Sequence, residues 1–152
     1  MKKLRAIEIL IIITVIFIWG QSVLPGSVSA GESGWVMEWV RPVLGAIIGE
    51  ANVTVYLIRK LAHFTEFFVL GAELAAYFGV CRKAGHNTVA VRMLRALGCG
   101  LAVAAVDETI QLFAEGRGAS IVDVCIDYSG VTAAVIVVWI IRRIICDTRG
   151  RS

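Results

Sequence analysis

Four long apolar stretches constrain the fold of this chain more than any other feature of its sequence. They cover about residues 7–24, 55–80, 94–113 and 121–141. A helix needs about 20 mostly apolar residues to cross a lipid bilayer, and a backbone inside lipid must satisfy its hydrogen bonds internally. The sequence therefore predicts an all-α, polytopic membrane protein in which these stretches form an antiparallel bundle of four transmembrane helices.

The composition excludes most soluble architectures. The 152 residues are 58% hydrophobic and only 18% charged, whereas soluble domains are about 45–50% apolar and about 25% charged. Such a chain has too few polar side chains to cover a water-soluble globule, and its length suits one domain. We therefore expect a single membrane domain over residues 1–152, and neither a multidomain soluble enzyme nor a disordered protein.

The distribution of basic residues predicts how the helices are oriented. Eleven of the 15 Lys and Arg residues precede the first stretch, lie between the second and the third or at the start of the third, or follow the fourth in the tail 142–152. Short cytoplasmic segments are enriched in such residues, so we expect a multi-pass plasma-membrane protein with both termini in the cytoplasm. This cationic face is an ordinary topology signal, and we expect no nucleic-acid partner.

A secretory signal peptide is an alternative interpretation of the first stretch. Basic residues within 2–5, an apolar core and the triplet Val28-Ser29-Ala30 resemble a leader with a small-residue cleavage site. Cleavage after Ala30 would leave three membrane helices and would not change the direction in which they run.

The first outer connection, about residues 25–54, predicts a short interfacial helix. It opens with a turn-rich stretch of Pro, Gly and Ser over residues 25–33. Apolar residues then recur at helical spacing: Trp35, Val36, Trp39, Val40, Val43 and Ile47. Such a pattern is typical of an amphipathic helix that lies in the membrane interface, anchored by its tryptophans. The helix either only covers the bundle or forms a lid over an outer site.

Charged residues inside the apolar stretches predict a polar site. Such residues are costly in a membrane and mark functional positions. Four patches fall in the same outer third of the predicted bundle, and several members share a helix face, as in the i, i+4 pairs Asp107–Gln111 and Asp123–Asp127. We expect an outward-facing pocket built by these patches: Gln21, Ser22, Arg59, Lys60, His63, Glu66, Asp107, Glu108, Gln111, Arg117, Asp123 and Asp127. Glu73 lies deeper and is left outside the site.

These polar segments resemble the signatures of VanZ-like membrane proteins. Residues 59–67, RKLAHFTEF, are similar to the family's RKxAHFxEY signature, with Phe67 where Tyr is usual. Residues 107–130 carry the elements DExxQxF, GR, S, D and DxxG of its second signature, with Glu115 where Pro is common. Gln21 and Ser22 resemble its N-terminal stretch. The resemblance implies an integral membrane protein of the cell envelope, and the family's namesake is associated with low-level teicoplanin resistance.

The first functional hypothesis is a binding protein. The pocket would hold the headgroup of a membrane lipid or of a lipid-linked cell-wall precursor, and Arg59, Lys60 and Arg117 would contact its phosphate or carboxylate. Aromatic residues would line the apolar part: Phe64, Phe67, Phe113, Trp35 and Trp39. Altered exposure of such a precursor would change antibiotic susceptibility, including susceptibility to teicoplanin.

The second hypothesis is an intramembrane enzyme that acts on the same kind of substrate. Its candidate catalytic residues are His63, Glu66, Asp107 and Glu108, acting as general acids or bases. Its candidate ligand-binding residues are Gln21, Ser22, Arg59, Lys60, Gln111, Arg117, Asp123 and Asp127. The chain has no GxSxG elbow, so an activated water is a better nucleophile than a serine.

Three further interpretations remain open from the sequence. The charges could form a buried ion-pair network that fixes helix register, or the pathway of a small oligomeric transporter. A metal ion could be held by His63, Glu66, Asp107 and Asp123. The predicted cluster has a single histidine and the chain has no HExxH motif, so we assign neither a metal nor a cofactor.

Overall fold

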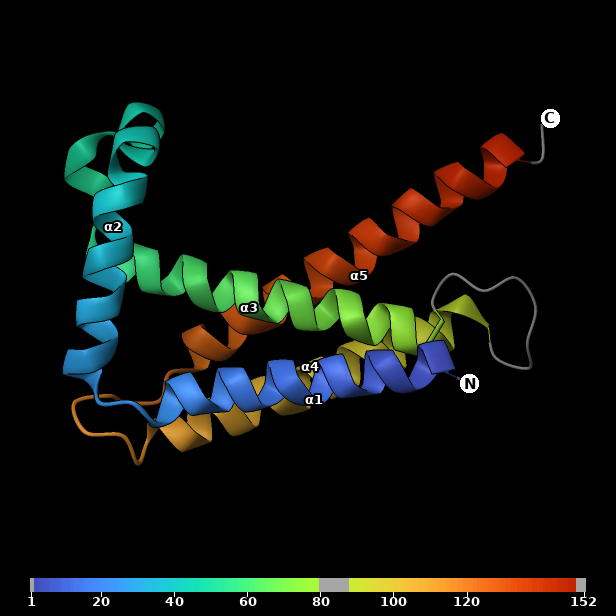
Figure 1. Ribbon diagram of the computed structural model, residues 1–152, viewed down its shortest axis with the longest axis horizontal. Coiled ribbons are helices and arrows are strands. Elements are labelled where there is room, and N and C mark those ends of the chain that lie inside the picture. Colours follow the sequence, from blue (N-terminus) through green and yellow to red (C-terminus); the bar gives the residue numbers. More distant parts are fainter. Residues whose placement is uncertain (1, 80–87, 150–152) are drawn as a thin grey trace.

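The structure, a computed structural model, describes residues 2–79 and 88–149, and these residues form five α-helices and one short 3-10 helix. The elements are α1 (Lys2–Val23), α2 (Gly26–Ile48), η1 (Glu50–Asn52), α3 (Val55–Tyr77), α4 (Val89–Gln111) and α5 (Ile121–Arg149). Figure 1 shows α1, α3, α4 and α5 running roughly along the long axis of the molecule, with α2 standing across one end. The predicted all-α class is confirmed.

Within residues 2–79 and 88–149, three helices are long and apolar enough to cross a membrane. They contain the segments Leu4–Val23, Val89–Gln111 and Ile121–Ile145, which match three of the four predicted spans in length and composition. Helix α3 has a similar length, but several charges interrupt its apolar character, so its crossing stays a prediction. It contacts all three of these apolar helices, and α5 most extensively.

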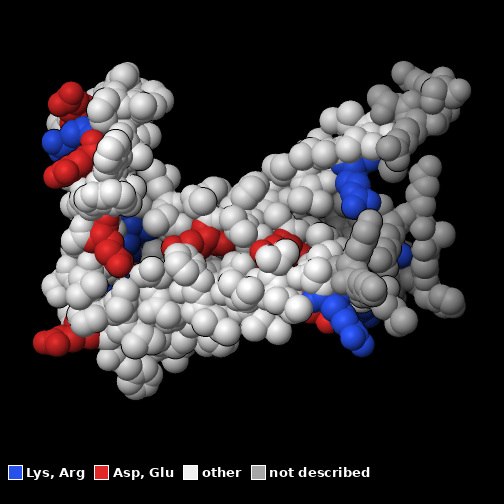
Figure 2. All heavy atoms as spheres, viewed as in Figure 1, with Lys and Arg blue, Asp and Glu red and all other residues white. Residues whose placement is uncertain are grey.

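The chain reverses direction at each connection between the long helices. The N-terminus, the end of α3, the start of α4 and the end of α5 all lie at the end of the molecule opposite α2 (Figure 1). We call this the basic end, because it carries the basic residues of these termini, some of them visible in Figure 2: Arg5, Arg92, Arg95, Arg142 and Arg143. Arg82, Lys83 and His86 lie outside the described residues.

The apolar core lies between α3 and α5 in the half of the bundle near the basic end. Phe67, Leu70, Val131 and Val135 are completely buried there. Further towards α2, Gly130 permits the closest approach of the two helices, because a Cβ atom at this position would collide with the carbonyl oxygen of Phe64. This contact brings the first turns of α5 against the first turns of α3.

The turn-rich segment predicted for residues 25–33 is helical in the structure, so that prediction is wrong. Helix α2 begins directly after Pro25 and continues to Ile48, with Pro42 inside it. Packing against α3 outweighs the low helix propensity of its glycines and serines. Trp35 and Trp39 make an edge-to-face contact 6.0 Å apart, yet both remain largely exposed. The amphipathic helix is therefore longer than predicted, and its place in a membrane interface stays a prediction.

Candidate functional site

The polar residues of four helices meet near the end of the bundle at which α2 lies. We call this end the α2 end. The first half of α3 carries Arg59, Lys60, His63 and Glu66, and the last turns of α4 carry Asp107, Glu108 and Gln111. The first turns of α5 supply Asp123 and Asp127, and α1 ends with Gln21 and Ser22. Local capping fixes where α3 starts, because the Thr54 hydroxyl accepts a hydrogen bond from the Leu57 backbone at 3.2 Å.

Asp107 is the most strongly held carboxylate of this group. It is completely buried, its Oδ1 accepts a hydrogen bond from the Ser22 hydroxyl at 2.6 Å, and its Oδ2 accepts one from the Gln111 amide at 2.8 Å. Charge-assisted bonds of this kind offset the cost of burying a carboxylate. They also tie the end of α1 to the end of α4, and fix which way the carboxylate points.

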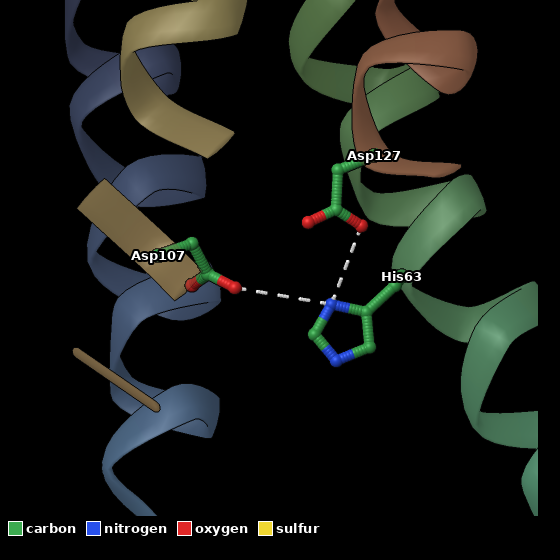
Figure 3. Close-up of side chains that lie close together, drawn as sticks. All are labelled: His63, Asp107 and Asp127. Carbon is green, nitrogen blue, oxygen red and sulfur yellow. Dashed lines mark ion pairs between the residues drawn. The ribbon is translucent and has the colours of Figure 1, made fainter. Parts of the chain in front are cut away.

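His63 lies between two buried carboxylates. Its Nδ1 is 3.6 Å from Asp127 Oδ1 and 4.0 Å from Asp107 Oδ2, and Figure 3 shows the ring facing both acids. The second oxygen of Asp127, Oδ2, is buried without a hydrogen-bond partner among the described residues. The three side chains offer ligand atoms that all lie within 4.8 Å of one another, so this is where the described residues could hold a metal ion.

Arg117 contacts the other edge of the histidine ring. Its Nη2 lies 3.4 Å from His63 Nε2, and its Nη1 donates to the backbone carbonyl of Gln21 at 3.1 Å. Burial lowers the pKa of Arg117, and the neighbouring Arg59 lowers it further, whereas the surrounding carboxylates act in the opposite direction. A partly buried cation thus faces the group of acids from the turn between α4 and α5.

The turn that carries Arg117 is held by the start of α2. The Gly26 backbone donates to the carbonyl of Glu115 at 2.8 Å. A Cβ atom at Gly26 would lie only 2.6 Å from the carbonyl oxygen of Gly116, so a glycine is needed for this approach. The short connection between α4 and α5 is therefore bonded to the start of α2.

A second set of contacts joins α3, α4 and α5. Lys60 forms an ion pair with Asp123, and its ammonium group also lies 5.1 Å from the centre of the Tyr56 ring. Glu108 accepts a hydrogen bond from the Ser120 backbone at 2.8 Å, directly before α5. An acceptor at this position satisfies one of the free N–H groups at a helix start. Lys60 and Asp123 therefore connect α3 to α5, and Glu108 connects α4 to the start of α5.

A cavity of about 670 Å³ lies between α1, α2 and α3. Most of its wall is apolar, and its polar members include four of the predicted site residues: Gln21, Arg59, His63 and Glu66. The consecutive residues Arg59 and Lys60 diverge here, because Arg59 faces the cavity while Lys60 turns to α5. His63 belongs to both the cavity wall and the acidic group, and it joins the two parts of the site.

The aromatic lining predicted for the apolar part is wrong. Phe67 lies in the core, Phe113 is 87% exposed, and the two tryptophans of α2 face away from the helix packing. Phe64 stacks on Phe68 instead. The cavity wall contains Phe17 and aliphatic side chains of α1, α2 and α3: Ile13, Val36, Val40, Leu44, Ile58, Leu61 and Val69.

Sequence reasoning missed polar residues that α2 brings to the site. Glu32 and Ser33 line the cavity, but they fell in the segment predicted as turns. The signal was the helical spacing of Val36, Val40 and Leu44, which extends back to Glu32. Glu73, which lay outside the predicted site, accepts a hydrogen bond from the Thr14 hydroxyl at 3.0 Å.

Comparisons with known proteins agree with the motifs of the sequence. A family model described as VanZ/LLP1 matches residues 8–142. The match covers most of the chain, includes every residue of the site described above, and confirms the resemblance. A comparison with curated proteins finds no match, and a comparison with solved structures finds none either.

Proposed function

The chain belongs to the VanZ/LLP1 family, and we propose that it is a multi-pass plasma-membrane protein that binds a lipid-linked molecule of the cell envelope at its α2 end. Helix α3 also crosses the membrane, so that α1, α3, α4 and α5 make four spans. The α2 end faces outward, and both termini face the cytoplasm. The concentration of basic residues at the opposite end supports this orientation. The whole chain acts as one membrane domain.

The cavity between α1, α2 and α3 carries this proposal. Its volume of about 670 Å³ falls in the range of about 300–1,000 Å³ typical of small-molecule sites. It combines a long apolar wall with a few polar groups that include Arg59, His63 and Glu66. A ligand with a hydrocarbon chain and a polar headgroup matches this division.

The headgroup is expected to be anionic. Arg59 reaches the cavity from α3, and Arg117 lies beside His63 at its edge. Guanidinium groups favour phosphate and carboxylate because they donate two parallel hydrogen bonds. Lys60 is engaged with Asp123, so the two arginines are the better candidates for the first contact with the ligand.

Helix α2 acts as the lid of this site in the membrane interface. One side of it forms a wall of the cavity through Val36, Val40 and Leu44. The adjacent stripe leaves Trp35 and Trp39 exposed, which is typical of residues at the level of lipid headgroups. A ligand could therefore enter sideways from the lipid layer beneath α2.

A role in antibiotic susceptibility follows from the same proposal. VanZ-like proteins take their name from a member associated with low-level teicoplanin resistance, and teicoplanin acts on the cell envelope. A protein that holds a lipid-linked cell-wall precursor would change how much of it is exposed to such a drug.

An intramembrane enzyme is the second candidate function, and the surroundings of His63 favour it. The ring lines the cavity, and its two nitrogens face carboxylates on one edge and Arg117 on the other. This arrangement can hold a proton near a bound headgroup, as general acid–base catalysis requires. His63, Glu66, Asp107 and Glu108 are the candidates for this chemistry.

The test is mass spectrometry of lipids that copurify with the full-length protein in mild detergent. We expect one class of anionic or phosphate-containing lipid in wild-type protein, and its loss in Arg59→Gln. The matched control is Arg41→Gln, because Arg41 is exposed on α2 and is not part of the cavity wall. Equal lipid content in both variants would contradict the proposed binding site.

The same method separates binding from catalysis in the native host. Envelope lipids are compared between wild type, a deletion strain and an Asp107→Asn strain at matched protein level. Accumulation of one lipid in both altered strains indicates turnover or movement of that lipid. Identical profiles in all three strains contradict the enzyme and leave binding.

A further inference from the structure

We propose that His63, Asp107 and Asp127 form a binding site for one divalent cation. The three residues come from α3, α4 and α5, so a bound ion would join three helices. Asp107 and Asp127 lie outside the wall of the apolar cavity, whereas His63 belongs to both the cavity wall and the proposed ion site. This inference goes beyond lipid binding, which does not require an ion.

The distances fit ligands of one ion better than they fit direct hydrogen bonds. His63 Nδ1 lies 3.6 Å from Asp127 Oδ1 and 4.0 Å from Asp107 Oδ2, and both separations exceed the usual limit of about 3.2 Å for a hydrogen bond. Nitrogen and oxygen ligands bound at about 2.0–2.2 Å to one ion lie roughly 3–4 Å apart, depending on the angle between them. Small side-chain shifts would complete the coordination.

An unsatisfied oxygen supplies an independent observation. Asp127 is 1% exposed, and its Oδ2 has no partner among the described residues. A buried carboxylate oxygen without a partner is costly and needs an explanation. Figure 3 shows both carboxylates directed towards the side of the ring that carries Nδ1. An ion in this space would supply the missing partner.

The charge of the surrounding group also favours a cation. Around a neutral His63, five carboxylates face three basic side chains in this part of the described chain: Glu66, Asp107, Glu108, Asp123 and Asp127 against Arg59, Lys60 and Arg117. With all five carboxylates ionised, two negative charges are left over in a poorly solvated region. One divalent cation would neutralise them, and so would two protons, which makes ion content the decisive measurement.

The ligand set suits Mn²⁺ or Zn²⁺ better than Ca²⁺. It offers one imidazole nitrogen and two carboxylates, whereas Ca²⁺ takes six to eight oxygen ligands. Imidazole together with carboxylate is compatible with Mn²⁺ and Zn²⁺. Three protein ligands leave at least one position of the ion free for water or for an anionic oxygen.

Hydrogen bonds to the carboxylate of Asp107 prepare it as a ligand. Ser22 and Gln111 each donate to one of its oxygens, and such contacts orient ligands in metal sites. Arg117 has the opposite effect on His63. An ion at Nδ1 leaves the proton on Nε2, which Arg117 approaches to 3.4 Å, so ion binding requires this guanidinium to withdraw from the ring.

The experiment measures metal content and stability of the full-length protein in phosphatidylcholine nanodiscs. Wild-type protein purified without chelator is analysed by mass spectrometry for Mn, Zn, Mg and Ca. We expect about one Mn²⁺ or Zn²⁺ per chain. After EDTA treatment, MnCl₂ or ZnCl₂ should raise the unfolding temperature, because the ion binds the folded state.

Asp127→Asn and Asp107→Asn should each weaken binding by roughly tenfold or more, because each removes a charged ligand. The control is Glu115→Gln, which removes one exposed carboxylate near the same end and should leave ion binding unchanged. Asp127→Asn removes a buried charge whose Oδ2 has no hydrogen-bond partner among the described residues, so without ions it should fold at least as stably as wild type. Loss of binding in this variant is then not a folding defect.

Arg117→Gln distinguishes this proposal from lipid binding. The variant removes the guanidinium group that competes for His63 Nε2, so it should keep or strengthen ion binding while it loses copurifying anionic lipid. The proposal is overturned if wild-type protein contains no stoichiometric ion and neither MnCl₂ nor ZnCl₂ stabilises it. It is also overturned if Glu115→Gln and Asp127→Asn lose binding equally.

Discussion

The two halves of the bundle use the same helices to bury opposite kinds of side chain. Near the basic end, Phe67, Leu70 and Val135 are buried against other apolar residues. Near the α2 end, the buried side chains include Asp107 and Asp127. Apolar packing can hold helices together without special partners, whereas buried charges need specific ones. We therefore expect the first half to contribute most of the stability, whereas the second half buries charges at a cost in free energy.

Glu73 is a carboxyl group inside the apolar half. It lies seven residues after Glu66, two turns further into the apolar half, and it bonds to Thr14 of α1. Its second oxygen is buried without a partner among the residues that the structure describes. Glu73 is thus an isolated carboxyl group with a single partner. At the α2 end, by contrast, the polar contacts together join several helices.

The largest expected effect lies in the apolar half. Phe67→Ala should lower the free energy of unfolding by about 3–5 kcal/mol, because it leaves a cavity between α3 and α5. The measurement is unfolding in mixed micelles with increasing SDS, followed by circular dichroism. Phe113→Ala is the matched control, because Phe113 is 87% exposed. If the two variants lost the same stability, the apolar half would not be the stabilising one.

A smaller effect is expected from the polar network. Ser22→Ala should destabilise the fold by about 1–3 kcal/mol, because it leaves Asp107 Oδ1 buried without the hydroxyl that donates to it. The same SDS titration measures it. Ser129→Ala serves as control, because that exposed hydroxyl donates only to the Ile126 carbonyl of its own helix. A Ser22 variant as stable as its control would show that this network is not needed for folding.

The contact between Thr14 and Glu73 in the apolar half should give a smaller effect still. Thr14→Val keeps the shape of the side chain but removes the donor to Glu73, so we expect a loss of about 0.5–1.5 kcal/mol. Thr109→Val is the control, since Thr109 is exposed and donates to Ala105 one turn earlier. A larger loss than in Ser22→Ala would place the critical polar contact in the apolar half and reverse the comparison.

The smallest change in stability is expected on the exposed stripe of α2. Trp39→Ala should alter the free energy of unfolding by no more than about 0.5 kcal/mol, because Trp39 is 71% exposed. It should, however, reduce the quenching of tryptophan fluorescence by lipids brominated near the headgroup. Unchanged quenching would contradict the interfacial position proposed for α2.

The helices, and the depth in the bundle at which the polar residues gather, could be predicted because they depend on local patterns. Apolar length predicted the helices that contain 4–23, 89–111 and 121–145. Helical spacing predicted that Asp107 and Gln111 share a face, and they are hydrogen-bonded. Both inferences need only the geometry of one helix.

Partners on different helices could not be predicted, because helix rotation decides them. Ser22 bonds to a carboxylate 85 residues away, and nothing in either segment specifies this pair. Arg59 and Lys60 were grouped together, yet neighbouring residues on a helix point about 100° apart. The start of α2 was missed for a related reason, because packing on α3 outweighed the local preference for turns.

The bond between Gly26 and Glu115 has a consequence for how sequences can vary at this turn. Position 115 contributes its backbone carbonyl to α2, while its side chain is exposed. A proline keeps that carbonyl, so the glutamate found here and the proline common in VanZ-like proteins can support the same bond. The bond depends on the path of the main chain at this turn. A larger residue at position 26 would collide with Gly116, whereas the side chain at position 115 takes no part in the bond.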